Sequence, residues 1–193
     1  MLTRRGRAVV GVAALAVVLA ATFGPRSLNA VVAPAAVVLA AGYLQVRNTP
    51  DVVVDRTPPA NAHVGECRTA ELSFRRRDGS ALARPFLADV TERVQGGLRP
   101  VESDDATVTE RADGDAEITF ETTIGDDPLR YEVAYEGRGQ HALGPATLTA
   151  TDAFGLFERE TELRDTETTI VYPQVRRLGT VGRRSLGRLQ EYS

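Results

Sequence analysis

The chain has 193 residues and a formal net charge of −3, and all 23 of its basic residues are arginine. Its length suits one ordinary domain with an extension, its single cysteine, Cys67, excludes an intramolecular disulfide, and two histidines without a cysteine pair leave no recognisable zinc site. Residues 1–50 hold five arginines and no acidic residue, whereas residues 51–173 hold 13 arginines and 25 carboxylates, and this acidic body argues against nucleic acid as a partner.

Residues 1–47 are predicted to form a two-helix transmembrane hairpin. The uncharged, apolar runs at about 8–23 and 28–46 each approach the ~20 residues that a helix needs to cross a bilayer. The segment 24–27 (GPRS) is predicted to form the turn between them, small residues allow the helices to pack closely, and Pro34 is tolerated within a span. A cleaved secretory or twin-arginine signal is the alternative, which the second apolar run disfavours.

Arginines at the ends of both runs predict the orientation of this hairpin. Arg4, Arg5 and Arg7 precede the first run and Arg47 follows the second, whereas Arg26 alone lies in the turn. Because arginine favours the cytoplasmic side of a membrane, we expect both termini and the soluble part to be cytoplasmic. The expected location is therefore the cell membrane, crossed twice, with the lipid bilayer as a partner.

The segment 48–173 is predicted to be an antiparallel β-sandwich of immunoglobulin-like class, so that the chain is mainly β. Apolar and polar residues alternate along 115–123 and 130–136, which is typical of strands with one buried face. Further candidates bring the total to about nine short strands at spacings typical of a sandwich. These candidates are residues 52–55, 69–75, 86–94, 107–110, 146–151, 156–163 and 168–172.

Turn-forming segments separate these strands. Asp-Gly pairs within 76–80 and 112–115 predict β-hairpins, and GDDP at 125–128 predicts a turn. Helical periodicity is not found in this part of the sequence. Its excess of carboxylates, with arginine as the sole basic residue, indicates a salt-rich cytoplasm, for which a GC-rich genome is the alternative explanation.

None of the candidate sites predicts a reaction. The glycines of 138–145 lack phosphate-loop spacing, DAFG at 152–155 lacks the other kinase motifs, and the acidic segment 102–115 does not match an EF-hand loop. His141 has no assignable nucleophile or orienting carboxylate and is interpreted as a surface residue, and 75–77 as a solvated hairpin tip. We therefore expect no catalytic, cofactor-binding or metal-binding residue and no enzyme activity.

The segment 138–151 is interpreted as two strand ends and the strand between them. Arg138-Gly139 is predicted to end one strand, because glycine adopts a positive φ without steric penalty. Gly144-Pro145 is predicted to begin the next strand, at a position where a missing N–H breaks no ladder.

A tight turn is predicted directly after this strand. Asp152 is expected to form an Asx-type turn in which Gly155 supplies the bend. Phe154 and Phe157 flank that glycine, and we expect both rings to anchor the turn in the core. The turn is therefore assigned a structural role.

The order of these features resembles a known family. Two apolar runs, a β-domain, RGxxxLGP, D-x-FGLF and a strand ending in VYP follow one another here, and across residues 1 to about 176 this order resembles the membrane proteins of the family called domain of unknown function 58. The matching residues are Arg138, Gly139, Leu143, Gly144, Pro145, Asp152, Phe154, Gly155, Leu156, Phe157, Val171, Tyr172 and Pro173.

The resemblance implies a longer protein and a partner. Ala153 stands where the family usually has proline, and family members continue into a domain resembling the von Willebrand factor A fold, so this chain is expected to be a truncated form. Its basic tail, 174–193, is interpreted as a linker or as a contact for anionic lipid or an acidic partner. The association of the family with MoxR-type AAA ATPases implies a role in the assembly or maturation of other proteins.

Two functional hypotheses follow from these observations. The first is a membrane-anchored β-sandwich that serves as an interaction or scaffold module without catalysis. The alternative is an exported, signal-bearing β-domain that acts as an adhesin or as a metal-dependent hydrolase.

Overall fold

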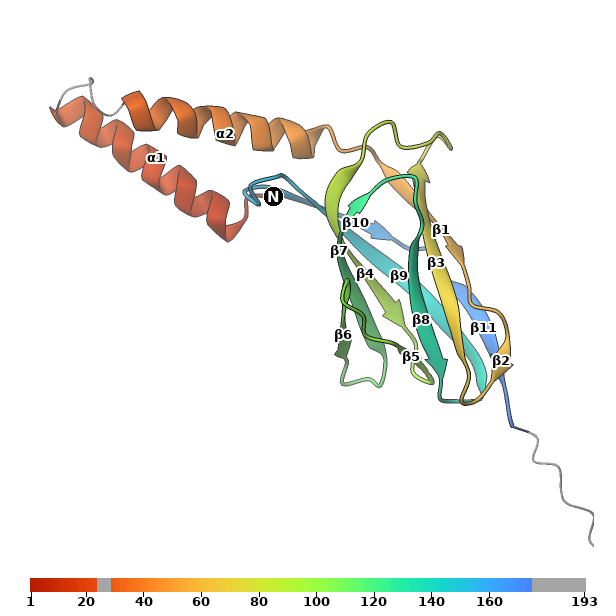
Figure 1. Cartoon of the computed structure of the whole chain (residues 1–193). Coiled ribbons are helices and arrows are strands. Elements are labelled where there is room, and N and C mark those ends of the chain that lie inside the picture. The colour runs from red at the N-terminus through yellow and green to blue at the C-terminus, as the bar shows by residue number, and fades with distance from the viewer. Residues whose placement is uncertain (24–28, 175–193) are drawn as a thin grey trace, which may run out of the picture.

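The computed structural model describes residues 1–23 and 29–174. Two helices extend from one end of a two-sheet β-sandwich, and the last strand ends at the opposite end of the sandwich (Figure 1). The turn predicted at 24–27 and nearly all of the predicted tail lie outside the described residues. The helices are α1 (Arg4–Phe23) and α2 (Asn29–Arg47).

The two helices occupy the two apolar runs of the N-terminal segment. The Thr3 hydroxyl accepts a hydrogen bond from the Gly6 amide at 3.0 Å and so caps the start of α1, and Pro34 lies within α2. Among the residues that the structure describes, no helix is both long enough and apolar enough to cross a membrane. The predicted helices are therefore present, but the predicted transmembrane spans are not found.

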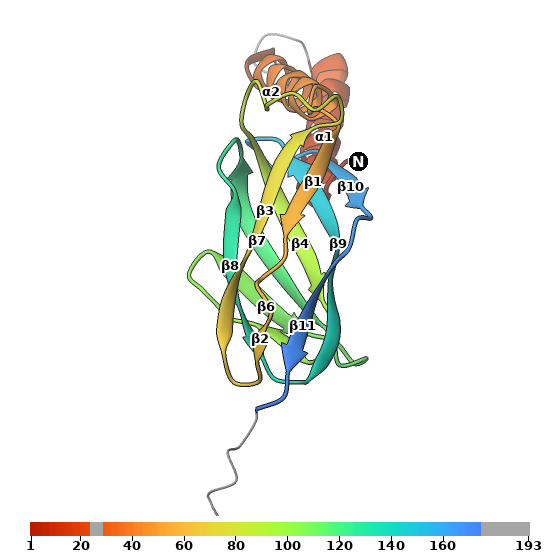
Figure 2. The same cartoon turned by 90° about the vertical axis from the view of Figure 1, so that its right-hand side faces the viewer.

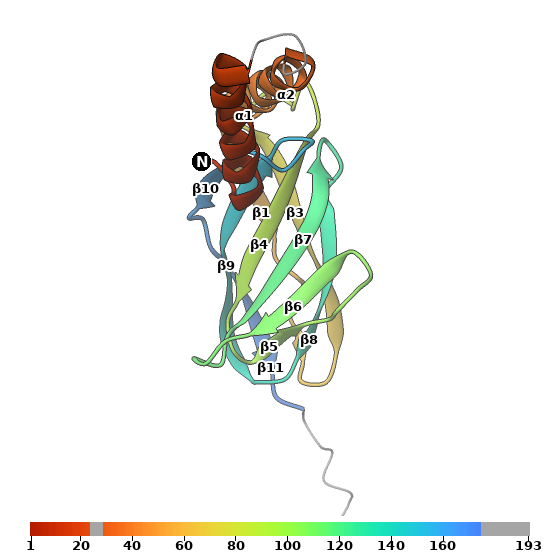
Figure 3. The same ribbon diagram turned by 90° about the vertical axis from the view of Figure 1, so that its left-hand side faces the viewer.

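The strands form two sheets that face each other. The smaller sheet has the order β1-β3-β8-β5, and the larger has the order β2-β11-β9-β4-β7-β6 with β10 also paired to β9 (Figures 2 and 3). The strands are β1 (Val52–Thr57), β2 (Ala62–His63), β3 (Cys67–Arg76), β4 (Phe86–Val94), β5 (Leu98–Pro100), β6 (Ala106–Glu110), β7 (Ala116–Ile124), β8 (Leu129–Tyr135), β9 (Gly139–Thr151), β10 (Glu158–Leu163) and β11 (Glu167–Tyr172).

The core lies between the two sheets and is built from alternate side chains. Ile118 and Phe120 of β7 are buried, and so are Tyr131, Val133 and Tyr135 of the facing strand β8. These are the residues that the period-two alternation places on one face of each strand. The prediction of a mainly β fold is confirmed.

The predicted strands are all present. Most of their ends differ by a few residues, but the strand predicted at 146–151 begins at residue 139. Two short strands, β2 and β5, were missed, because runs of two and three residues carry no alternation. The antiparallel prediction is wrong at one place, since β2 pairs with β11 in parallel.

The turn at 112–115 joins two paired strands, β6 and β7, as predicted. The turn predicted at 76–80 is not a hairpin, because it leads from one sheet to the other, and so does the turn predicted at 125–128. The first lies between β3 and β4 and the second between β7 and β8. An Asp-Gly pair reverses the chain locally, but the burial of both sheets against one core decides which strand lies alongside.

The prediction that a new strand begins at Gly144-Pro145 is also wrong. Strand β9 runs without interruption from residue 139 to 151 and changes partners at this dipeptide. Residues 139–143 pair with β11, whereas 146–151 pair with β10. Gly144 has a φ of +94° and proline donates no hydrogen bond, so one strand bends here instead of two strands meeting.

Candidate functional site

The turn between β9 and β10, residues 152–157, lies at the end of the sandwich from which the helices extend (Figure 1). It contacts the first residues of the chain, the first turns of α1 and the last turns of α2. We call this contact the helix–sandwich junction and define it as residues 1–6, 42–49 and 152–159.

Asp152 organises the turn. Asp152 is 2% exposed. Its Oδ2 accepts a hydrogen bond from the Phe154 amide at 3.0 Å, and this bond forms the predicted Asx-type turn. Its Oδ1 accepts two further hydrogen bonds, from the amides of Leu156 at 2.7 Å and Phe157 at 2.6 Å. One carboxylate therefore satisfies three backbone donors that the tight turn would otherwise leave without partners.

The first residues of the chain pair with this turn like a short strand. The Thr3 amide donates to the Leu156 carbonyl at 2.9 Å, and the Glu158 amide donates to the Met1 carbonyl at 2.8 Å. These bonds join residues more than 150 positions apart. The beginning of the chain is thereby fixed to the sandwich before α1 starts.

The first turn of α1 approaches the turn at backbone distance. The Thr3 hydroxyl, which caps the helix, also donates to the Gly155 carbonyl at 2.7 Å. A Cβ atom built on Gly6 would lie only 2.2 Å from the Leu156 carbonyl oxygen. Only glycine permits this approach at position 6, because any side chain there would push the helix away from the turn.

The last turns of α2 cover the other side of the turn. A Cβ atom on Gly42 would lie 2.8 Å from Oδ2 of Asp152, so this helix also approaches closely. The Tyr43 and Phe157 rings meet edge to face, with centroids 5.8 Å apart. Both helices are thus held against a single turn of the sandwich.

The two phenylalanines of the turn do not lie where the sequence predicted. Phe154 is 54% exposed and does not anchor the turn in the core. Phe157 packs on Tyr43 of α2 instead of inside the sandwich, and Leu156, 5% exposed, is the buried apolar residue of the turn. The helices, whose docking no local pattern predicts, determine which ring is covered.

The connection from α2 to β1 is also tied to the sandwich. Arg159 of β10 donates to the Thr49 carbonyl at 2.9 Å and to the Asp51 carboxylate at 2.6 Å. Arg159 therefore fixes the segment after α2 through one main-chain carbonyl and one side-chain carboxylate.

The remaining motif residues do not gather at the junction. Arg138 is exposed, and the prediction that Arg138-Gly139 ends a strand is wrong. The preceding strand, β8, ends at Tyr135, and Gly139, with a φ of +128°, begins β9. Val171 is buried on β11, Tyr172 is 44% exposed, and Pro173 follows them at the far end of the sandwich. The sequence motifs thus belong to separate parts of the fold and form no single pocket.

The motif LGP borders a buried ion pair that the sequence did not reveal. Nε of Arg56 donates to Oε1 of Glu92 at 2.5 Å, and the two side chains are 1% and 0% exposed. The Tyr131 hydroxyl donates to the other carboxylate oxygen at 2.9 Å. A Cβ atom on Gly144 would lie 3.0 Å from Nη2 of Arg56, so glycine makes room for the guanidinium.

Burial governs the ionisation of Glu92 and Tyr131. It raises the pKa of Glu92 above the ordinary value, against the opposing pull of Arg56 and the hydrogen bond from Tyr131. Burial, followed by the charge of Glu92, raises the pKa of Tyr131 well above its ordinary value, so the hydroxyl remains a donor. The three side chains come from β1, β4 and β8 and meet inside the sandwich.

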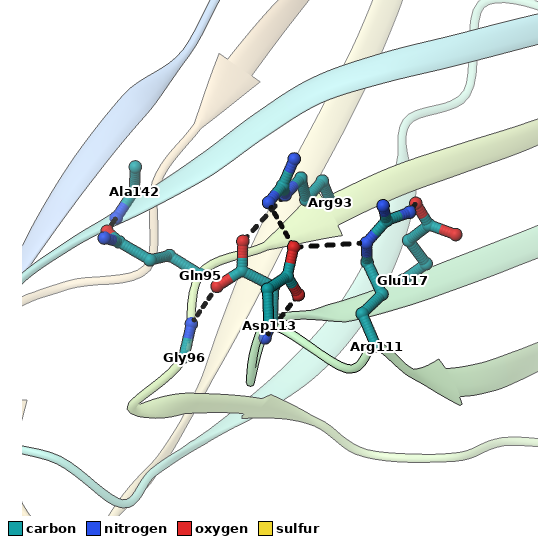
Figure 4. Close-up of polar contacts among 8 residues, drawn as sticks. Arg93, Gln95, Gly96, Arg111, Asp113, Glu117 and Ala142 are labelled. Carbon is teal, nitrogen blue, oxygen red and sulfur yellow. Dashed lines mark hydrogen bonds and ion pairs between the residues drawn. The ribbon is translucent and has the colours of Figure 1, made fainter.

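A second polar cluster lies at the opposite end of the sandwich. Oδ2 of Asp113 lies 2.8 Å from Nη2 of Arg93 and 3.6 Å from Nε of Arg111. Figure 4 shows the Asp113 side chain between these two arginines. Asp115 accepts from the Gly96 amide at 2.9 Å and from Arg93 at 2.7 Å. The Gly96 hydrogen bond, with Arg93, lowers the pKa of Asp115 below its usual range. These carboxylates fasten the β6–β7 turn to the end of β4.

His141, predicted to be a surface residue, is half-buried in this region. Its Nε2 lies 2.8 Å from the Gly137 carbonyl oxygen, and a Cβ atom on Gly97 would lie 2.3 Å from its ring. Within the described ranges, no group of three or more His, Cys, Asp and Glu residues could hold a metal ion. The His141 ring packs the turn that contains Gly97 against the turn that contains Gly137.

Replacement of Gly155 by valine is expected to destabilise the fold by about 1–2 kcal/mol, because its φ is +64°. Space does not limit the substitution, since the nearest atom to a new Cβ would be Nη1 of Arg5 at 3.9 Å. Gly155→Asn is the matched control, because asparagine tolerates this conformation better. Thermal unfolding measures the difference, and an unchanged melting temperature for Gly155→Val would contradict the argument.

Comparisons with known proteins find distant structural similarities and no match in sequence. No family model matches the chain, and no curated protein matches it significantly in sequence. A cohesin module from a Clostridium perfringens family 33 glycoside hydrolase is 13% identical with a TM-score of 0.45, covering 65% of this chain and 100% of that one. The CARDB domain of a Pyrococcus furiosus protein, in complex with di-metal ions, is 13% identical with a TM-score of 0.37, covering 65% and 90%.

A C-terminal fragment of the major pilin GBS80 of Streptococcus agalactiae is 10% identical with a TM-score of 0.38, and the match covers 62% of this chain and 56% of that fragment. With identities of 10–13% and TM-scores below 0.5, these similarities carry no inference about this chain. The fold and the junction together define the class of this protein, a β-sandwich domain on which an N-terminal pair of apolar helices is docked.

Proposed function

We propose that this protein is a membrane-anchored interaction module, in which the helices embed in lipid and the junction holds the β-sandwich at the bilayer surface in a fixed orientation. The observation that carries the proposal is the exposure of large apolar side chains around helices that are docked at one end only. The sandwich, in this proposal, binds other proteins and catalyses no reaction.

The exposed apolar side chains of α1 lie on several sides of the helix. Val10, Val12, Leu15 and Val17 are between 41% and 62% exposed. Successive residues of an α-helix are rotated by about 100°, so Val10 and Val12 point to nearly opposite sides. A helix covered by one protein surface would show a single apolar stripe, whereas lipid accommodates apolar side chains in every direction.

The second helix continues this apolar surface toward the sandwich. Val37 is 68% exposed and Leu44 is 51% exposed. Tyr43, at 49%, lies near the junction, where an amphipathic ring suits the boundary between lipid and water. The arginines also fit this boundary between lipid and water, because Arg4 and Arg47 lie at the sandwich end of the helices.

Extraction of the full chain from membranes tests this proposal. We expect the protein to stay in the membrane pellet after an alkaline carbonate wash and to dissolve in detergent. The double variant Val12→Lys with Leu15→Lys should shift it to the soluble fraction, because each charge at a helix centre opposes insertion by about 3 kcal/mol. Leu87→Lys, which changes a 41% exposed leucine of β4, is the matched control. Release of the wild type by carbonate would refute the proposal.

Cys67 can report the side of the membrane on which the sandwich lies, which the arginines predict to be the cytoplasmic side. This residue is the single cysteine of the chain and is exposed at the start of β3. If the sandwich is cytoplasmic, a membrane-impermeant maleimide should label Cys67 only after the cells are lysed. Labelling in intact cells would favour the exported adhesin or hydrolase instead.

We further propose that the sandwich contacts a MoxR-type AAA ATPase, as the family resemblance implies, in the assembly or maturation of other proteins. Crosslinking in intact cells, followed by purification of the full chain in detergent and mass spectrometry, tests this contact. Recovery of such an ATPase with the wild type but not with an unrelated membrane protein is the expected result.

A further inference from the structure

Beyond anchoring, we propose that the helix–sandwich junction binds one anionic phospholipid, with an acyl chain in the cavity beside α2 and the phosphate on Arg47. The inference rests on the proposed embedding of the helices in lipid. It assigns to the junction a specific ligand, where anchoring alone requires only a general apolar surface.

The cavity lies between the last turns of α2, the first residues of the chain and the start of β10. Its volume is about 440 Å³, within the range of roughly 300–1,000 Å³ that small-molecule sites occupy. Leu2, Tyr43, Val46 and Phe157 supply an apolar part of its wall. Such a wall suits a hydrocarbon chain, which gains free energy by leaving water.

The rim of the cavity carries one arginine that is free to bind an anion. Arg47 is exposed, and among the described residues no acceptor pairs with its guanidinium. Arg159 lines the same cavity but is paired with Asp51 at 2.6 Å, and the N-terminal ammonium donates to the Glu158 carbonyl. Arg47 is therefore the arginine of this cavity that has no carboxylate partner among the described residues, and a guanidinium can bind a phosphate through two parallel hydrogen bonds. The N-terminal ammonium lines the same cavity and adds a second positive charge, whereas the Glu158 carboxylate adds one negative charge.

The surroundings favour an anionic lipid over other ligands with an apolar part. Arg4, Arg5 and Arg7 are exposed at the start of α1, and no described residue forms an ion pair with them. Most arginines of the sandwich that the structure describes are instead paired with carboxylates, as Arg75 is with Asp55. Positive charge without partners thus concentrates beside the apolar helices, where anionic headgroups would lie.

Titration of the full chain in nonionic detergent tests the site. Thermal unfolding should shift upward on addition of phosphatidylglycerol, and about one molecule per chain should stay bound through gel filtration, because a ligand that binds only the folded state stabilises it. Phosphatidylcholine should give a smaller shift. Glycerol phosphate, which has the anion without the chains, should give none at the same concentration.

Arg47→Gln should weaken the phosphatidylglycerol effect about five- to tenfold, the change expected for one arginine beside a lipid phosphate. Arg68→Gln makes the same change in charge at the far end of β3 and should leave the phosphatidylglycerol effect unchanged. Val46→Phe, which fills the cavity without altering charge, should weaken binding as well.

The site is refuted if Arg47→Gln binds phosphatidylglycerol like the wild type, or if glycerol phosphate stabilises the protein equally. The proposed anchoring has its own readout. A protein that resists carbonate extraction but does not prefer phosphatidylglycerol would overturn the lipid site and leave anchoring intact, whereas release by carbonate would overturn anchoring.

Discussion

Arg56→Ala is expected to destabilise the β-sandwich by about 3–5 kcal/mol, the usual effect of removing one partner of a buried ion pair. Glu92 would remain inside the sandwich, 0% exposed, with Tyr131 as its remaining donor. Urea unfolding of the full chain in detergent measures the loss through the midpoint at constant slope.

Two variants separate charge from packing in this prediction. Arg75→Ala removes a partner of Asp55 from a pair whose side chains are 50% and 54% exposed, and the loss there should not exceed about 1 kcal/mol. Combining Arg56→Met with Glu92→Leu should restore much of the lost stability, because no charge then remains buried. Equal losses for Arg56→Ala and Arg75→Ala would contradict the assignment.

The loss of unfolding free energy in Arg56→Ala, relative to wild type, should depend on pH. Burial already raises the pKa of Glu92 above its ordinary value of 4.5, and loss of Arg56 removes an influence that lowers it. Between the unfolded and the folded pKa, the folded variant binds more protons than the unfolded chain, so its stability falls as the pH rises through that window. Relative to wild type, the deficit should be smallest near pH 4.5 and largest at alkaline pH.

Asp152→Ala is expected to destabilise the protein by about 3 kcal/mol and to loosen the helices from the sandwich. The amides of Phe154, Leu156 and Phe157 would lose their acceptor. The Leu156 hydrogen bond is buried and the other two are partly buried, and a buried donor left without a partner costs about 1–3 kcal/mol. Amide hydrogen exchange of residues 154–157, measured by mass spectrometry, should accelerate together with a lower melting temperature.

Asp78→Ala is the matched control for this prediction. Asp78 also accepts a hydrogen bond from an amide two residues ahead, that of Ser80 at 2.9 Å, but its turn is exposed and holds no helix. Water can replace its carboxylate, so the melting temperature should change far less. Asp152→Asn should give an intermediate loss, because one amide oxygen can accept at Oδ1 whereas the NH₂ group cannot accept from Phe154. Wild-type exchange rates at 154–157 in Asp152→Ala would refute the role of this carboxylate.

Much of the secondary structure could be predicted, because its signals are local. The alternation in β7 and β8 gave the correct buried faces, and the apolar runs gave α1 and α2. The Asx-type turn at Asp152 was also predictable, since its donor lies two residues ahead. Strands β2 and β5 were not, because so few residues show no period.

The candidate site was much harder to predict. Asp152 and Gly155 were identified as a turn, yet the pattern around them says nothing about α1 or α2, which begin far away in the chain. Gly6 and Gly42 look like ordinary members of apolar helices, and their role depends on the carbonyl and carboxylate that they approach. The ring of Phe157 is covered for the same reason.

The sequence by itself determined the β class, the helical segments, the acidic body and the turn residues, because periodicity, charge and backbone preference act between near neighbours. The tertiary structure alone decided which turns join neighbouring strands, where β9 bends, that Arg56 meets Glu92 from 36 positions away, and that the DAFGLF turn carries both helices. These features follow from two sheets and two helices burying surface against one another, and such contacts between distant segments leave no local pattern to read.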